Sequence, residues 1–583
     1  MGMLKNWKFK NLSSTDSSDA SLSNAATERA TWSERLEISP VLVNILLLRG
    51  CTSLEDMDVF LSPHLRLLAP PEQWPGVVEA AEILSQCLIN GAPFLVWGDY
   101  DVDGITASAL VLDVLEGHGI PARHHLPDRR EEGYGLNIPM LEKFAAEGVK
   151  VLLTVDCGIS DVNAVTRARE LGMTIIISDH HLPPAVLPPA HAICNPRLAP
   201  CPCPQLAGVG VAFFLMAAVN ARLEVHTGRR FDMREVLDLV ALGTLADVVR
   251  LTGQNRILAK NGLLKIANPQ RIGMMALKTI SGFTLSASLG GGQVVFSICP
   301  RINAAGRMGL AAMALALLRS KSHEEAARLA QKLDDLNTER RAEEERIQKE
   351  ARIEALKYSD KASLVLHGKD WHPGVIGIVA SRIVDEFYKP TLILCDDAHN
   401  IKGSGRSVNE FDLHAGLSDI ADVFLTYGGH KQAAGMRLDA QRLEELRQRF
   451  EASVCTAIGS APLAPTVMLD GTLDFAQASD LVFLQELELL QPFGAGNAEP
   501  VFASPPLLVK NRRVFGRGRE HLSLELLDES TGISLHAKAW RQAATMPESL
   551  QGTRIRLAYA PRIDKYNGIS NVDIRIKDWK KEK

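Results

Sequence analysis

Three short apolar runs in the first half of the chain predict β-strands. They are Phe94–Trp97, Val151–Val155 and Thr174–Ser178, and each is mostly β-branched or aromatic. Continuous runs of this length suit strands buried on both faces of a parallel sheet. Helical spacing of apolar positions fills the intervals, at residues 107–118, 138–147 and 161–171. This alternation predicts an open α/β domain with right-handed crossovers.

The remaining patterns predict helices and a second group of strands. Helical spacing covers residues 34–89, 206–221 and 233–245. Residues 323–358 are rich in Ala, Glu, Arg and Lys and lack Gly and Pro, which predicts one long polar helix that connects two domains. A second α/β region follows, with strands at 362–367 and 391–395 and a helix at 376–387. From about Pro465, short alternating strands predict a small β-barrel of the OB type.

We therefore expect an α/β protein built from five parts. Residues 1–33 are expected to be disordered, because residues 11–33 are rich in Ser, Thr, Ala and Asp. The first α/β domain spans residues 34–322, and the connecting helix spans 323–358. The second α/β domain spans residues 359–460, and the OB-like barrel spans 461–583.

Composition excludes several classes of protein. With 46% hydrophobic and 23% charged residues, the 583-residue chain resembles an ordinary globular protein. No run of about twenty apolar residues predicts a membrane span, and the basic N-terminus lacks the apolar core of a secretory signal. Nine scattered cysteines favour a reducing cytoplasm over a disulfide framework. Because the net charge is −5, phosphate binding requires local positive patches or metal ions.

One cysteine-rich segment raises a zinc site as an alternative. His191, Cys194, Cys201 and Cys203 lie close together in sequence. Their spacing matches no standard zinc finger, and the segment is rich in proline. A loop with free thiols is the interpretation we favour.

Acids and histidines follow each of the three predicted strands. Asp99, Asp101 and Asp103 follow the first strand, Asp156 follows the second, and Asp179-His180-His181 follows the third. The carboxyl ends of parallel strands form the ligand crevice of an open sheet, so these clusters are expected to meet at one edge. A fourth acid, Asp247, ends a hydrophobic helix and can reach the same place.

Such a cluster of acids predicts a divalent metal site. Carboxylates packed closely repel one another unless cations neutralise them. Carboxylates with one or two imidazoles suit two Mn²⁺ or Mg²⁺ ions, which can grip a phosphate ester, with Asp156 as the bridging ligand. Each cluster alone has an ordinary explanation: Asp-x-Asp occurs in turns, Asp179 can cap a turn and His180 can be a core histidine. Together they favour the metal site, with Asp99 as the acid that can face away from it.

Four motifs resemble those of the DHH phosphoesterase family, in the family's order. They are Asp-Tyr-Asp-Val-Asp-Gly at 99–104, Val-Asp-Cys-Gly-Ile-Ser at 155–160, Asp-His-His at 179–181 and Gly-Thr-Leu-Ala-Asp-Val-Val at 243–249. Further segments resemble the members of this family that digest single-stranded DNA. These lie at Arg129 with 132–136, and at 206–212, 300–307, 371–378, 402–407, 428–430 and 492–497.

The resemblance implies a role for each matching residue. It implies that the first domain is the DHH catalytic domain and that a DHH-associated domain closes the cleft across the connecting helix. The implied metal ligands are Asp101, Asp103, Asp156, His180 and Asp247, with Asp99 completing the first site. His181 is implied to touch the scissile phosphate or help protonate the leaving group, and Asn303 and Arg307 to hold backbone phosphate. The implied pocket for a terminal 5′ phosphate consists of Arg129, Ser404 and Arg406, with His430 lining the cleft.

The implied activity is 5′-to-3′ hydrolysis of single-stranded DNA, with release of mononucleotides, in repair and recombination. The implied partners are a single-stranded DNA with a 5′ end, a single-strand-binding protein and a helicase, and no membrane. Ser404 lies between two glycines, and we expect a loop here whose backbone amides can face an anion. Taken without the resemblance, residues 402–406 suggest a polar hairpin turn instead. The barrel has a local positive face from Arg512, Arg513, Arg517 and Arg519.

Two other functions compete with this interpretation. One is a DHH phosphoesterase acting on short oligonucleotides, cyclic dinucleotides or pyrophosphate, although such enzymes are usually shorter and lack a barrel. The other is a non-catalytic scaffold that binds nucleic acid. Degenerate members of that kind lose metal ligands, whereas every ligand position is occupied here.

Overall fold

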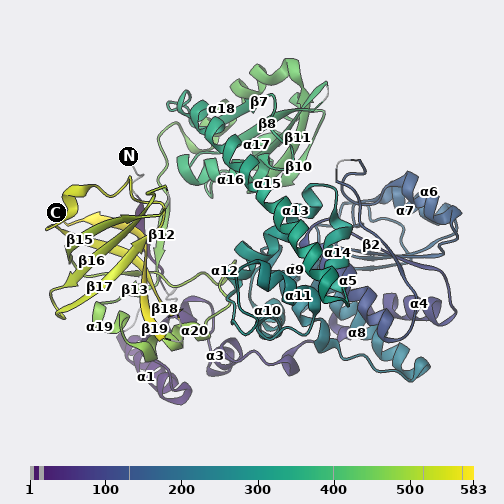
Figure 1. Ribbon diagram of the computed structural model, residues 1–583, viewed down its shortest axis with the longest axis horizontal. Helices are drawn as coiled ribbons and strands as arrows, with labels where there is room; N and C mark the ends of the chain where they lie inside the picture. Colours follow the sequence, from purple (N-terminus) through teal and green to yellow (C-terminus); the bar gives the residue numbers. More distant parts are fainter. Residues whose placement is uncertain are drawn as a thin grey trace. The chain divides into compact units, whose positions relative to one another are not determined.

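The computed structural model describes residues 5–11, 19–129, 131–397, 399–516, 518–566 and 569–582. These residues fall into two compact units (Figure 1). Of the described residues, 7–334 and 467–582 form the first unit, and 5–6 and 335–466 form the second.

A five-stranded parallel sheet lies in the first unit, with strand order β3-β2-β4-β5-β6. The three predicted strands are confirmed as β2 (Phe94–Gly98), β4 (Val151–Val155) and β5 (Thr174–Ser178). The edge strands β3 (Arg123–His125) and β6 (Ala192–Cys194) have three residues each, too few to show a pattern in the sequence.

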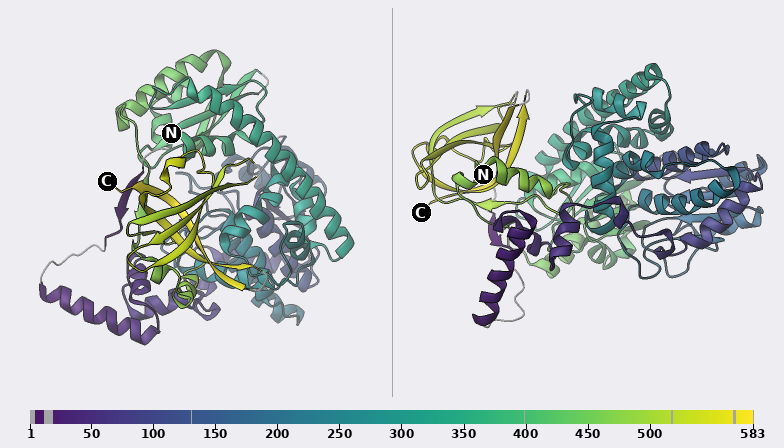
Figure 2. Two further views of the ribbon diagram at one scale, coloured as in Figure 1. Left: turned by 60° about the vertical axis from the view of Figure 1, so that its left-hand side comes forward. Right: turned by 90° about the horizontal axis from the view of Figure 1, so that it is seen from below.

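Helices cover both faces of this sheet (Figures 1 and 2). One face packs against α6 (Ile138–Ala146) and α7 (Val162–Glu170), whose apolar residues share a core with β2, β4 and β5. The other face lies against α5 (Val102–Gly117) and α8 (Gly208–Thr227). The crossover helices α5, α6 and α7 connect parallel strands and so hold their carboxyl ends at one rim, as the alternation predicts.

Further helices complete the first unit. Those before the sheet are α2 (Pro40–Leu48), α3 (Leu54–Leu61) and α4 (Val77–Ile89). Those after α8 are α9 (Leu237–Ala246), α10 (Gly253–Ala267), α11 (Ile272–Ile280), α12 (Gly291–Gln293), a π-helix at Val294–Ile298, α13 (Cys299–Arg307) and α14 (Ala311–Arg319). Among the described residues, α8 alone is long and apolar enough to cross a membrane, but 72% of its apolar window is buried, as in a core helix.

The predicted connecting helix is confirmed as α15 (His323–Leu356), which has 34 residues. Pairs of opposite charge three or four residues apart line its surface, for example Arg346 with Glu343 and Glu350. Its last turns bury Ile347, Ala351 and Ala355 in the second unit.

The second unit contains a mixed sheet of order β10-β11-β9-β8-β7. Its strands are β7 (Leu364–Gly368), β8 (Thr391–Asp397), β9 (Asn400–Arg406), β10 (Thr426–His430) and β11 (Ala433–Asp439). Only β7 and β8 run parallel. The helices are α16 (Ile376–Phe387), α17 (Leu413–Ser418) and α18 (Leu443–Ile458).

A barrel of OB type completes the first unit, as predicted. Its strands are β15 (Leu507–Phe515), β16 (His521–Asp528), β17 (Ile533–Ala539), β18 (Arg554–Tyr566) and β19 (Ile569–Lys581). They pair in the ring β15-β16-β17-β19-β18-β15 around a common interior (Figure 2, yellow). Two short helices, α19 (Phe475–Ala478) and α20 (Leu481–Leu489), and strand β14 (Phe502–Ala503) precede it. Arg517, counted with the positive face, lies outside the described residues.

The expectation of a disordered N-terminal segment is wrong for much of its length. Strand β1 (Asn6–Phe9) pairs with β12 (Thr466–Leu469), and helix α1 spans Asp19–Leu36. Ala and Glu favour a helix here, and Trp32 and Leu36 pack against the core that α2, α3 and the barrel share. This burial adds stability that composition alone does not reveal. Residues 1–4 and 12–18 lie outside the described part of the chain.

Candidate metal centre

The acid and histidine clusters meet at the rim of the parallel sheet, as predicted. His180 lies at their centre, after β5. Its Nε2 atom is 3.2 Å from Asp156 Oδ1, 3.6 Å from Asp247 Oδ2 and 4.0 Å from Asp103 Oδ2. Acids from three separate segments of the chain are therefore within the reach of a common ion.

The potential ligand atoms form overlapping groups, each with atoms within 4.8 Å of one another. One group joins Asp99, Asp101 and Asp156, and another joins Asp103, His180 and Asp247. The third joins Asp156 to His180 and His181. Asp99 faces inward with the other acids, and Asp156 lies between the first two groups, in contact with His180 of the second.

Several buried side-chain atoms in this cluster have no hydrogen-bond partner. Within the described chain, Asp99 Oδ1, Asp156 Oδ1 and His180 Nε2 are buried and accept or donate no hydrogen bond. Buried polar atoms are nearly always paired, so atoms of this kind need an explanation. Carboxylate oxygens and one imidazole nitrogen, turned toward one another, are a donor set that fits Mn²⁺ or Mg²⁺.

Burial and mutual repulsion perturb the protonation of this cluster. Burial, and then the charges of neighbouring acids, raise the pKa of Asp103 to about 7 and that of Asp247 to about 8. The same causes raise the pKa values of Asp99 and Asp156 well above the usual range. Burial and the neighbouring His181 lower the pKa of His180 to about 3, so its imidazole is neutral and can act as a ligand.

Local structure holds the acids in place. Asp101 caps α5, its Oδ1 accepting from the amides of Asp103 (2.8 Å) and Gly104 (3.1 Å). The Asp103 carboxylate accepts from the amides of Gly208 (2.7 Å) and Val209 (2.8 Å) at the start of α8. Asp156 has a φ of 63°, a left-handed conformation that costs a non-glycine residue energy and is typical of functional sites.

Asp179 is buried and organises the two histidines, as a cap does. Its carboxylate accepts from the amides of His180 (2.7 Å) and Ile159 (2.9 Å) and pairs with His181 Nδ1 at 2.7 Å. Burial acts to raise the pKa of Asp179, but these bonds outweigh it and the pKa is lowered. Burial acts to lower the pKa of His181, but the hydrogen bond with Asp179 and the charge of Asp179 outweigh it and raise the pKa to about 9.

Tyr134 is a contact of the site that sequence reasoning did not single out. Its hydroxyl is 3.3 Å from the Asp156 carbonyl and 3.2 Å from His181 Nδ1. The only signal in the sequence was its place in the segment 132–136, which matched the family without an assigned role.

Two predicted phosphate-binding arginines lie close to the acid loop, residues 99–101 between β2 and α5. The first is Arg129, whose guanidinium lies 5.3 Å from the centre of the Tyr100 ring and whose charge acts on Asp99. Glu132 holds the loop of Arg129 by accepting from the Asp128 amide (3.0 Å) and pairing with His125 (2.8 Å).

Helix α13, which carries Asn303 and the second arginine, Arg307, comes close to the same loop. A methyl group at Gly306 would overlap the Tyr100 carbonyl, and the charge of Arg307 acts on Tyr100. Asn303, one turn earlier, is partly exposed.

Ser404, Arg406 and His430 belong to the second unit, and the expected loop around Ser404 is wrong. Ser404 lies in the middle of β9, paired with Ile393 of β8 and Gly435 of β11, so its amide faces a strand and not an anion. Gly403 and Gly405 occupy the buried positions of β9, which hides the alternation of a strand.

The side chains of Ser404 and Arg406 nevertheless lie together on one face of this sheet. Arg406 Nη1 donates to Ser404 Oγ at 3.1 Å. A methyl group at Gly377, in the first turn of α16, would lie 3.0 Å from Ser404 Oγ and 3.2 Å from Arg406 Nη2. His430 of β10, which is exposed, lies opposite Ala433 of β11. Ala433 in turn lies opposite Arg406 of β9, so the three residues form one cross-strand row.

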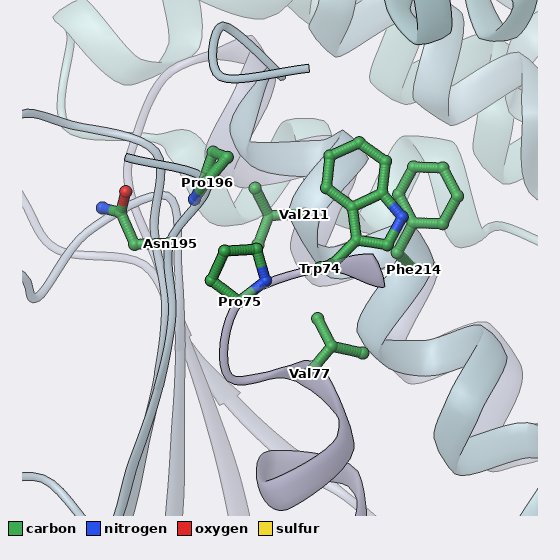
Figure 3. A pocket seen from close by; sticks show the side chains of 7 residues that line it. All are labelled: Trp74, Pro75, Val77, Asn195, Pro196, Val211 and Phe214. Carbon is green, nitrogen blue, oxygen red and sulfur yellow. The ribbon is translucent and has the colours of Figure 1, made fainter. Parts of the chain in front are cut away.

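Two other features of the first unit do not form a ligand site. A cavity of about 10 Å³ between Trp74, Phe214 and Asn195 holds about one water, so it cannot admit a nucleotide (Figure 3). Among the described residues, no group able to share an ion includes the cysteines near His191. All nine cysteines are free thiols, and the expected loop is wrong for Cys194, which lies in strand β6.

Comparison with known proteins matches each domain. The N-terminal domain of the DHH family matches residues 93–244, the DHHA1 domain 360–455 and the RecJ OB domain 469–578. The single-stranded-DNA-specific exonuclease RecJ of Bacillus subtilis is 33% identical, covering 94% of this chain and 68% of that protein. RecJ of Escherichia coli is 34% identical, and the match covers 93% of this chain and 96% of that protein.

Solved structures agree with the sequence matches. The crystal structure of RecJ from Thermus thermophilus in complex with Mn²⁺ has a TM-score of 0.81 and 31% identity, covering 96% of this chain and 78% of that chain. The Mg²⁺ complex of the same protein has a TM-score of 0.76 and 30% identity, and the match covers 96% of this chain and 77% of that chain. Matching domains in the same order, near-complete coverage and a common fold show that this chain belongs to the RecJ family of DHH proteins.

Proposed function

We propose that this protein is a metal-dependent exonuclease specific for single-stranded DNA, which degrades a strand in the 5′-to-3′ direction and releases 5′-mononucleotides. The observation that carries the proposal is the convergence of buried, unpaired carboxylate and imidazole atoms around His180 in a chain of the RecJ family. A role in repair and recombination follows from that activity.

Two divalent ions, Mn²⁺ or Mg²⁺, are proposed to occupy the cluster. Asp99, Asp101 and Asp156 would hold one ion, and Asp103, His180 and Asp247 the other, with Asp156 shared between them. When bound, such ions neutralise the acids, make a water acidic enough to attack at neutral pH and stabilise the leaving oxygen.

The protein's own groups are proposed to position the scissile phosphate and supply the proton. Water attacks phosphorus, the bond between phosphorus and the 3′ oxygen breaks, and a proton goes to that oxygen. Because Asp179 binds Nδ1 of His181, the Nε2 atom remains for the phosphate or the leaving oxygen. Asn303 and Arg307 would hold the neighbouring backbone phosphate.

The polarity of digestion requires recognition of the phosphate at the 5′ end of the strand. Arg129, Ser404 and Arg406 are proposed to bind that terminal phosphate, and His430 to line its path. Arg406 and Ser404 already share a hydrogen bond on one sheet face, and Arg129 lies beside the acid loop. A pocket that recognises the 5′ phosphate would set the direction in which the strand is degraded.

The barrel is proposed to grip the strand farther from the cut. Trp540 is 47% exposed and packs edge-on against His521 (4.7 Å) and Phe515 (5.6 Å). Arg513, Ser523, Lys538 and Arg575 form the adjacent cross-strand row on the outer surface. Exposed aromatic rings beside a basic row suit stacked bases and backbone phosphates.

We also propose the domain limits, the cellular location and the partners of this protein. We place the catalytic domain at 34–322, the connecting helix at 323–358, the DHH-associated domain at 359–460 and the barrel at 461–583. Nine free thiols support a reducing cytoplasm as the place of action. A single-strand-binding protein and a helicase would supply the substrate.

The test is digestion of 5′- and 3′-labelled single strands, with and without Mn²⁺ or Mg²⁺. Asp156→Ala should lower the rate at least about a hundredfold while leaving DNA binding in EDTA unchanged. Asp58→Ala, at an exposed acid of α3, is the matched control. Persistent cleavage by Asp156→Ala would refute the metal assignment. Preference for a dinucleotide over the long strand would instead assign the site to a short-oligonucleotide phosphodiesterase.

A further inference from the structure

The Gln491–Asn497 loop joins α20 to the barrel strands and has no role in the mechanism above. Asn497 is fully buried and folds the loop tightly, its side-chain amide donating to the carbonyls of Leu490 (2.7 Å) and Pro492 (2.8 Å). Gly494 and Asn497 exchange backbone hydrogen bonds of 2.9 and 3.1 Å. The loop is therefore a closed, rigid turn.

This loop lies directly against the segment that follows Asp247. The Leu251 amide donates to the Ala495 carbonyl at 2.8 Å. A methyl group at Gly494 would lie 2.8 Å from Leu251 Cδ1, and one at Gly496 would lie 3.1 Å from Arg250 Cβ. Glycine at these two positions allows this close approach, because an added methyl group would press on the side chains of Leu251 and Arg250 and require them to shift.

Two cations of α10 fasten the start of the loop to the catalytic domain. Arg256 of α10 is 2% exposed and donates to the carbonyls of Leu489, Leu490 and Gln491 at 3.0–3.2 Å. Lys260, one turn later, donates to the Leu489 carbonyl at 2.9 Å. The loop thus has a fixed position relative to α9 and α10.

The segment after Asp247 needs such support because its backbone is strained. Val248 has a φ of 59°, a left-handed conformation that is unfavourable for a β-branched residue. On its N-terminal side, Asp247 is held by α9 through a bond from its amide to Gly243. On the C-terminal side, the supports are the Gln491–Asn497 loop and Asn255, which donates to the Arg250 carbonyl at 3.1 Å.

We propose that the Gln491–Asn497 loop positions Asp247 and thereby sets the affinity of the ion held by Asp103, His180 and Asp247. Attachment of the barrel is then coupled to the metal centre and not only to DNA. This inference rests on the proposed metal site. The loop residues are positioning residues, because they act on the ion through Asp247 and the segment that follows it.

Two glycine substitutions in the full-length chain separate positioning from general damage. Gly496→Ala adds a methyl group against Arg250 at a φ of 71°. Gly532→Ala is the matched control, because Gly532 has a φ of 72° and nothing within 4 Å of the added methyl group. Both carry a similar conformational cost, but only Gly496→Ala adds a methyl group that presses on a neighbouring side chain, that of Arg250. Gly494→Ala, against Leu251 without a left-handed φ, is the second test should Gly496→Ala fold poorly.

Mn²⁺ binding is counted by electron paramagnetic resonance of the free ion, without DNA. We expect Gly496→Ala and Gly494→Ala to weaken the second of two ions about tenfold and to raise the Mn²⁺ concentration for half-maximal cleavage equally. At saturating Mn²⁺ the cleavage rate should return toward that of the wild type. Gly532→Ala should bind both ions as the wild type does.

The outcomes distinguish this inference from the function it rests on. Unchanged Mn²⁺ affinity in both loop variants overturns the positioning role, and so does an equal loss in Gly532→Ala. If the wild-type chain and Asp156→Ala bind Mn²⁺ alike, the proposed metal site itself fails, whatever the loop variants do.

Discussion

Asp247→Asn should make the cation-free protein less sensitive to rising pH. Asp103 and Asp247 have pKa values of about 7 and about 8 in the folded chain, whereas an unfolded aspartate has a pKa of about 3.9. Between these limits the folded state binds more protons than the unfolded state. The stability that these protons provide is therefore full below about pH 4 and is lost as the pH rises through 7 to 8.

The size of the effect follows from proton linkage. A carboxyl that is protonated when folded and ionised when unfolded removes about 1.4 kcal/mol of stability per pH unit. Between pH 5.5 and 7.5, Asp247 should remove up to about 2.7 kcal/mol, which Asp247→Asn avoids because an amide does not ionise. The variant also relieves repulsion at Asp156, whose pKa is raised by the charge of Asp247.

Thermal unfolding in EDTA across this pH range provides the measurement. The melting temperature of the wild type should fall more steeply than that of Asp247→Asn, by a few degrees. Asp58→Asn, at an exposed acid on α3, should follow the wild type. Parallel curves for wild type and Asp247→Asn would show that burial does not protonate this cluster, and the electrostatic argument would be wrong.

Metal addition should reverse the trend. Ions at a hundred times their Kd stabilise a folded protein by about 2.7 kcal/mol. Binding must displace the protons of Asp103 and Asp247, so Mn²⁺ should raise the melting temperature more at pH 7.5 than at pH 5.5. A larger Mn²⁺ effect at pH 5.5 would contradict the assignment of these protons.

Three further changes test other parts of the molecule. Trp540→Ala should weaken single-strand binding in EDTA by about 1–3 kcal/mol, measured by fluorescence anisotropy, whereas Val482→Ala, at an exposed apolar residue of α20, should not. Glu132→Ala should loosen the Arg129 loop and reduce the preference for 5′-phosphorylated over 5′-hydroxyl strands about tenfold in kcat/KM, and an unchanged ratio would exclude Arg129 from that pocket. Lys278→Met should cost about 3 kcal/mol of stability in thermal unfolding, because the three N–H donors of buried Lys278 are shared among the carbonyls of Ile266, Ala267, Leu285 and Ala287, each 2.6–3.0 Å from Nζ. Little change would mean that water replaces the ammonium group.

Local patterns in the sequence determined the elements that carry the chemistry. Runs such as Val151–Val155 are apolar at nearly every position, which is typical of a strand buried on both faces. Because parallel strands end at one rim, the acids after β2, β4 and β5 had to meet there. The segment at β9 escaped detection because glycines fill its buried positions, where Leu392, Leu394 and Met436 leave no room for a side chain.

Tertiary structure alone decided how the metal-site residues are supported. Asp103 accepts amides of α8 that lie 105 and 106 residues away, and the segment after Asp247 meets the distant Gln491–Asn497 loop. Helix α1 forms in a segment of polar composition, where Trp32 packs against a core that includes barrel residues far away in the sequence. Hydrophobic periodicity records which face of an element is buried, but it carries no information about the partner. Contacts between distant segments depend on the packing of the whole unit, so only the folded chain determines them.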